Sequence, residues 1–190
     1  MLNIVKLIFI CTLGFLSGNH VHAESLPLYR NSISVQLGAY QLKSSKSTLS
    51  SLGSLNFQYD YHFTEKWYGS AAYQFIVQSA GGFSSLVSGF DVGGHYCVFA
   101  CIPVRSEVGG MIEVTEESKF GLAVGVGFSG RSFQLTTQSV GYSGPFAELT
   151  ADYYLGSKWK IVSSLQVLKL SNGPNELNAQ VFGLGLGLDF

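Results

Sequence analysis

The chain has 190 residues, enough for one domain with a single core. Only 12% of its residues are charged, about half the share usual in soluble domains. Its formal net charge is −1, and because there is no excess of basic residues, nucleic acid is excluded as a partner. Hydrophobic residues reach 46%, but after the first segment they are dispersed rather than gathered in long blocks, so a membrane role would have to rest on strands.

Residues 1–23 have the pattern of a secretory signal peptide. Lys6 supplies the positive charge, residues 7–16 form an apolar run, and Val21-His22-Ala23 fits a cleavage site of the small-x-small type. The apolar run is about half as long as a transmembrane helix requires. We therefore expect residues 1–23 to be removed and residues 24–190 to form the mature domain.

Two cysteines remain in the mature chain, Cys97 and Cys101. In an oxidising compartment outside the cytoplasm they are expected to form a disulfide. Of the residues near them only His95 could add a metal ligand, so we expect neither a metal site nor a cofactor.

Apolar and polar residues then alternate along the chain. In residues 55–63, for example, Leu55, Phe57 and Tyr59 alternate with Asn56 and Gln58, which gives a strand with one aromatic and one polar face. Segments with this pattern, or a weaker form of it at 133–140, are 31–42, 55–63, 67–78, 86–96, 104–114, 120–128, 133–140, 145–155, 159–170 and 178–190. The serine-rich stretch 44–54 and residues 171–175 are predicted to be surface loops.

Regularly spaced short strands indicate an all-β sandwich or barrel. A closed antiparallel up-and-down transmembrane β-barrel is favoured, because closure pairs every backbone group and strands of about 9–11 residues suffice to cross a bilayer. Aromatic residues near two predicted turns, among them Phe63, Trp67, Tyr153 and Trp159, suit an interfacial girdle. Counting each segment once predicts ten strands; the turn-like residues 115–119 favour eight.

The last strand is the most specific feature. It carries Phe182, Leu184, Leu186, Leu188 and the terminal Phe190 on one face, and so resembles the C-terminal signature strand of bacterial outer-membrane proteins. The mature chain is similar in pattern to the small outer-membrane barrels typified by the OmpA membrane domain and OmpX. The resemblance implies short periplasmic turns, longer outer loops, both termini in the periplasm and an assembly signal formed by these five residues. We therefore expect an exported outer-membrane monomer whose partners are lipid and the assembly machinery.

Charged and histidine residues fall on the predicted inward face. They are Asp60, His62, Asp91, His95, Arg105, Glu107, Glu113, Glu148, Asp152 and Lys160. A turn at residues 98–100 would place Cys97 opposite Cys101 and Arg105 near Asp91 and Glu107. We interpret the set as a lumen network of paired charges, because buried charges must be paired.

A structural or surface-interaction role without a catalytic site is therefore the predicted function. Two alternatives remain. A lipid- or peptide-cleaving barrel enzyme could use His62 with Asp60 or His95 with Asp91, although no serine motif marks a nucleophile. A narrow porin-like pore could use space left by inward glycines such as Gly125 and Gly185, although about eight strands leave an interior just filled by side chains.

Overall fold

The computed structural model describes residues 26–27, 30–44, 48–80, 83–101, 104–108, 112–116, 119–135, 138–156 and 158–190. The predicted signal peptide, residues 1–23, lies outside these ranges. In the described ranges no helix is long and apolar enough to cross a membrane. The strands are β1 (Leu26–Pro27), β2 (Asn31–Ser44), β3 (Thr48–His62), β4 (Trp67–Ala80), β5 (Phe83–Phe99), β6 (Val104–Val108), β7 (Ile112–Glu116), β8 (Phe120–Leu135), β9 (Gln138–Tyr154), β10 (Trp159–Asn172) and β11 (Asn175–Asp189).

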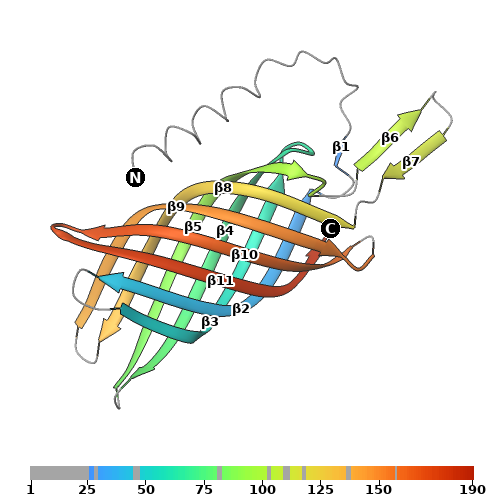
Figure 1. The fold of residues 1–190 in the computed structure, drawn as a ribbon. Helices are drawn as coiled ribbons and strands as arrows, with labels where there is room; N and C mark the ends of the chain where they lie inside the picture. Colours follow the sequence, from blue (N-terminus) through green and yellow to red (C-terminus); the bar gives the residue numbers. More distant parts are fainter. Residues whose placement is uncertain are drawn as a thin grey trace.

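A closed antiparallel barrel dominates the fold (Figure 1). Its strands follow the order β10-β11-β2-β3-β4-β5-β8-β9, and β9 pairs with β10 to close the ring. The predicted up-and-down barrel is thus confirmed, but the prediction of ten strands is wrong, because the barrel has eight.

Two of the ten predicted segments are not separate barrel strands. Residues 133–135 and 138–140 belong to one long hairpin, in which β8 and β9 pair as far as Leu135 and Gln138. Residues 104–114 contribute to β6 and β7, which form a small separate sheet with β1. The alternation predicts where strands occur. It does not show that the β8–β9 hairpin is long, or that the β6–β7 hairpin lies outside the ring.

The two ends of the barrel differ in their connections. We call the end that carries Asn31 and Phe190 the terminal end; there the two residues bond to each other through their backbones. Strand β5 ends and β8 begins at this end, and the small strands β6 and β7 lie beyond it (Figure 1). At the opposite end, which we call the hairpin end, only residues 45–47, 81–82, 136–137 and 173–174 separate consecutive strands. The stretch 44–54 is therefore mostly strand rather than the predicted loop, since β3 begins at Thr48.

An apolar belt surrounds the outer face, as the alternation predicts. Its most exposed members include Leu37, Phe63, Val77, Phe90, Val92, Val126, Phe128, Leu155, Trp159, Phe182 and Leu184. Among the described outward-facing strand residues the charged ones are Lys43, Lys169 and Glu176, all near the hairpin end. From Trp159 to Val167 the belt covers about 26 Å of strand, or about 20 Å of height at a tilt of about 40°, close to the band of known membrane barrels.

Above the belt, toward the hairpin end, the polarity of the wall reverses. The interior there holds an apolar cluster of Tyr40, Leu42, Ile76, Val87, Phe146, Leu168, Leu170, Ala179 and Val181, with Phe133, Tyr142 and Leu177 packed against it. The outer face at this level carries exposed polar residues such as Gln41, Asn178 and Gln180. This part of the barrel therefore has the arrangement of a water-soluble protein, with an apolar interior and a polar exterior.

Pro145 interrupts the barrel wall near this level. The ladder between β9 and β10 runs as far as Phe146 paired with Leu168, and resumes at Ser143 paired with Ser171. Proline has no N–H to donate, so a gap in the ladder at this position follows directly from the sequence.

Leu170→Ala tests the apolar cluster, because Leu170 is fully buried within it. We expect the free energy of unfolding to fall by about 2–5 kcal/mol through lost packing and an unfilled cavity. Urea titration of the refolded barrel in lipid vesicles, followed by tryptophan fluorescence, gives the measurement. Gln180→Ala, on the exposed outer face of β11, serves as the control and should change stability by less than about 0.5 kcal/mol. Equal effects of the two variants would show that the interior at the hairpin end is hydrated.

Candidate functional site: the polar lumen

Below the apolar cluster the lumen is polar, because every second residue of each strand points inward. Its buried polar side chains include Ser34, Gln36, Gln58, Asp60, His62, Ser70, Gln74, Asp91, His95, Ser129, Arg131, Thr150, Asp152, Lys160, Ser164, Gln166 and Asp189. Lumen charges and amides lie close together in three groups, which are described from the terminal end upward.

The lowest group is centred on Lys160. Its Nζ atom lies 3.2 Å from Oδ2 of Asp152 and 3.1 Å from Oδ1 of Asp189, and all three side chains are buried. Space for the lysine comes from Gly187, where an added Cβ would lie 3.0 Å from two carbons of the Lys160 side chain. The glycine on β11 thus makes room for the cation of the neighbouring strand.

The middle group contains the histidines. His95 Nε2 lies 2.7 Å from Oγ of Ser70 and 3.8 Å from Oε2 of Glu148. The Tyr68 ring lies between the two imidazoles, with its centroid 4.6 Å from that of His95 and 4.8 Å from that of His62. The three rings lie in register on the adjacent strands β3, β4 and β5.

The upper group is an ion pair reinforced by an amide. Nη2 of Arg131 lies 2.7 Å from Oδ2 of Asp91, and Nε2 of Gln166 donates to the same oxygen at 3.2 Å. Glycine again provides the space, because a Cβ on Gly89 would lie 2.6 Å from Cδ of Arg131. Because both charges are buried, this pairing is needed to offset their desolvation.

The geometry does not assemble a catalytic triad. In a Ser–His–carboxylate triad the nucleophile and the carboxylate contact different imidazole nitrogens. Here Ser70 and Glu148 both approach Nε2 of His95, and Nδ1 has no hydrogen-bond partner among the described residues.

Neither predicted His–Asp pair is present in the described lumen. Asp60 accepts a hydrogen bond from Gln58 at 2.8 Å, whereas both nitrogens of His62 lack a hydrogen-bond partner among the described residues. Asp91 pairs with Arg131, and His95 contacts Ser70 and Glu148 instead.

Three of the predicted lumen residues lie elsewhere. Arg105 and Glu107 belong to β6 and Glu113 to β7, outside the barrel ring. The predicted position of Arg105 near Asp91 is therefore wrong, because Asp91 is opposite Ser129 on β8. Their spacing indicated a strand next to β5 in the barrel, but that place is taken by β8, which pairs with β5.

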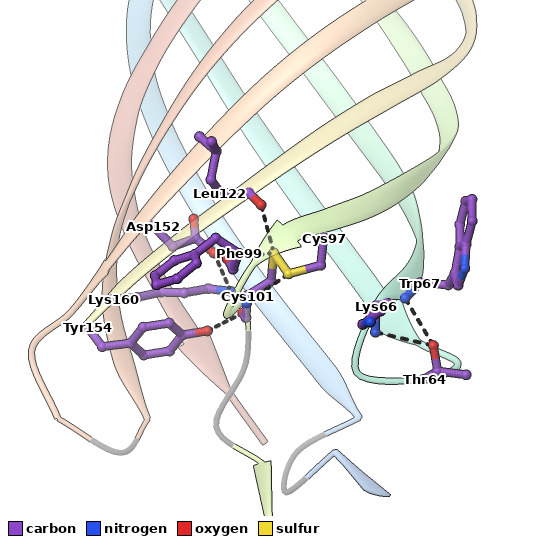
Figure 2. Close-up of a disulfide and its surroundings, with 10 residues drawn as sticks. All are labelled: Thr64, Lys66, Trp67, Cys97, Phe99, Cys101, Leu122, Asp152, Tyr154 and Lys160. Atoms are coloured by element: carbon purple, nitrogen blue, oxygen red, sulfur yellow. Dashed lines mark hydrogen bonds and ion pairs between the residues drawn. A yellow bond between two sulfur atoms is a disulfide. The ribbon is translucent and has the colours of Figure 1, made fainter. Parts of the chain in front are cut away.

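The predicted disulfide between Cys97 and Cys101 is confirmed, with Cα atoms 5.7 Å apart. It joins Cys97, near the end of β5, to Cys101, which follows that strand, and so it does not link two paired strands (Figure 2). The Tyr154 hydroxyl donates to the carbonyl oxygen of Cys101, and a Cβ on Gly121 would lie 2.9 Å from the carbonyl oxygen of Ala100. The disulfide loop is thus folded against the lumen mouth at the terminal end.

Sequence reasoning missed Arg131, Asp189 and Ser70 as members of these groups. Arg131 lies between the predicted segments 120–128 and 133–140, yet it continues the inward register of Gly127 and Ser129. Extending that register by two steps would have found it.

A small cavity lies within the polar lumen. A cavity lined by residues including Gln36, Asn56, Gln74 and Glu148 has a volume of about 10 Å³, room for about one water molecule. Inward side chains from opposite sides of the barrel occupy its interior, as expected for eight strands.

Comparison with solved structures identifies the architecture. Neisserial surface protein A superposes with a TM-score of 0.61 at 8% identity, covering 84% of this chain and 97% of that one. OprG of Pseudomonas aeruginosa gives a TM-score of 0.54 at 12% identity, covering 85% and 96%, and Ail of Yersinia pestis gives 0.53 at 13% identity, covering 85% and 99%. Neither a protein-family model nor a curated protein sequence matches the chain. The protein therefore has the fold of the small bacterial outer-membrane β-barrels.

Lys160→Met tests the lowest charge group. Removing the cation leaves Asp152 and Asp189 buried without it, so the free energy of unfolding should fall by about 3–5 kcal/mol. Lys169→Met is the matched control: Lys169 pairs with Glu176 on the exposed surface, and its loss should cost less than about 1 kcal/mol. Urea titrations of both variants, together with Lys160→Met combined with Asp152→Asn and Asp189→Asn, give the measurement. The combined variant should regain stability, and a Lys160→Met variant as stable as the control would contradict the role of the ion pairs.

Proposed function

We propose that this protein resides in a bacterial outer membrane as a closed, non-conducting barrel with a structural or surface-interaction role. The observation that carries the proposal is the apolar belt, which lacks charged residues among its described members. A surface of this kind is stable against lipid and would promote aggregation in water.

The contents of the lumen favour this role over a pore. The polar half is filled by the three charge and amide groups, and the half toward the hairpin end by the apolar cluster. An ion crossing the barrel would have to displace packed leucine, isoleucine and phenylalanine side chains without compensating polar contacts.

Catalysis is not favoured by the geometry of the lumen either. Ser70, the hydroxyl in contact with His95, is buried inside the wall, and its contact uses the same imidazole nitrogen that faces Glu148.

A surface role would depend on the strands themselves. The resemblance to small outer-membrane barrels implied long outer loops, yet the connections at the hairpin end are short and the long excursion lies at the terminal end. If the terminal end faces the periplasm, as that resemblance implies, the surface offered to the outside consists of the polar outer faces of the hairpins, for example Lys43, Asn178 and Gln180.

Cell fractionation combined with planar-bilayer recording tests the proposal. The full chain expressed in a Gram-negative host should be found in the outer-membrane fraction and migrate differently on gels when heated, because closed membrane barrels resist unfolding by detergent. The purified barrel should then give no channel events. Recovery as a soluble protein would contradict the membrane location, and steady unitary conductance would contradict a sealed lumen.

Phe190→Ala tests the proposed assembly signal. Phe190 is half exposed on the outer face, so its ring adds little to the interior. We expect less barrel to reach the outer membrane of living cells, with refolding into lipid vesicles in vitro almost unchanged, because only the first process requires recognition by the assembly machinery. Phe128→Ala, a similarly exposed change on β8, is the control and should be inserted normally in both systems. A parallel loss in vesicles would instead assign the effect to stability.

A further inference from the structure

Two hollows lie side by side in the outer face of the barrel. The first, of about 380 Å³, is lined by residues that include Ile33, Val35, Phe57, Tyr59 and Ala71. The second, of about 530 Å³, is lined by residues that include Ser88, Gly130, Ser132, Gly141 and Ser143. Both are bordered by Tyr73 and Phe90, so they lie on the two sides of one aromatic ridge.

The ridge is well defined. Tyr73 and Phe90 are paired across β4 and β5 with ring centroids 4.4 Å apart, and Phe75 packs edge-on against Tyr73 at 4.5 Å. On the side of the first hollow, Ala71 is placed between Tyr59 and Val92 on the neighbouring strands, so one short side chain sets the depth.

The second hollow forms where glycines take the place of larger outward-facing residues. The row of paired residues that contains Tyr73 and Phe90 continues to Gly130 on β8 and Ser143 on β9. At both Gly130 and Gly141 an added Cβ would meet no atom within 4 Å, so the space above them is open.

The chemistry of the two hollows differs in the direction expected for an amphiphile. The first hollow belongs to the apolar belt, which faces acyl chains if the protein lies in a bilayer. The second, nearer the hairpin end, presents the hydroxyl-bearing Ser88, Ser132 and Ser143 close to the level at which the outer face becomes polar. Arg131 also borders the second hollow, but it is buried and paired inward with Asp91, so no exposed cation is offered to a phosphate.

We infer that this side of the barrel binds one outer-leaflet lipid that straddles the ridge. An acyl chain packs in the first hollow, and the uncharged ester or amide linkage of that lipid contacts the serines of the second. A peptide partner fits less well, because β3, β4, β5 and β8, which supply most of the lining of the two hollows, are each paired with a neighbouring strand on both sides. The inference rests on the proposed membrane location and on the proposed orientation, with the hairpin end toward the outside.

Native mass spectrometry tests the inference. The full-length protein is inserted into nanodiscs of equimolar phosphatidylethanolamine and lipid A, released into a mild detergent and weighed. The wild type should retain one lipid A molecule per barrel, whereas Ala71→Phe and Gly130→Val, which fill the two hollows, should lose it. Gly94→Val is the matched control, since Gly94 is an exposed glycine on β5 with open space above it but borders neither hollow.

Each other outcome overturns the inference. Equal retention by all variants would indicate ordinary annular lipid, retention of phosphatidylethanolamine alone would exclude the outer leaflet as the source, and a mass of two chains would assign the hollows to a second copy. Heat-dependent gel migration of the same samples separates the two proposals. An inserted barrel without bound lipid contradicts only the lipid site, whereas a barrel that does not insert contradicts the membrane location as well.

Discussion

The closed ladder of backbone hydrogen bonds is the constraint on which the rest of this structure depends. In a bilayer no water is available to pair a free N–H or C=O group, so strands can be stable there only as a ring. The ring is completed by the pairing of β9 with β10, two strands adjacent in the chain, and by that of β11 with β2, which brings the two ends of the barrel sequence together. Once the ring is closed, every inward side chain has to fit within a fixed, narrow bore.

The narrow bore explains why glycine and large polar side chains occur as neighbours. A Cβ on Gly125 would lie 2.2 Å from the His95 ring, one on Gly183 would lie 2.3 Å from Gln36, and one on Gly187 would touch Lys160. At these three glycines, the space that could have marked an open channel is instead occupied by side chains of the adjoining strands. Filling the bore with polar groups then requires that these groups pair, which the ion pairs of Lys160 and Arg131 achieve.

Much of this could be predicted from the sequence. Period-two alternation gave the closed barrel, the outward belt and the inward positions of residues such as Asp91, Asp152 and Lys160, because the pleat alone decides which face a side chain occupies. Strand number and register could not be obtained in this way. Both depend on which strands are neighbours. Residues 104–114 alternate as well as any wall strand, yet β6 and β7, to which they contribute, form a separate sheet with β1. The partners of His95 were missed for the same reason, since Ser70 and Glu148 come from strands that only the ring brings together.

The reversal of polarity along the barrel axis links these features to function. The strands continue past the belt, and beyond it the same alternation places Leu168 and Leu170 inside and Lys169 outside. The inner face is thus polar within the belt and apolar above it, so a column of water through the bore would have to pass the apolar cluster. At the opposite mouth the disulfide loop is held by Tyr154. The apolar cluster at one end and the disulfide loop at the other are the features on which the proposed surface role, rather than solute transport, depends.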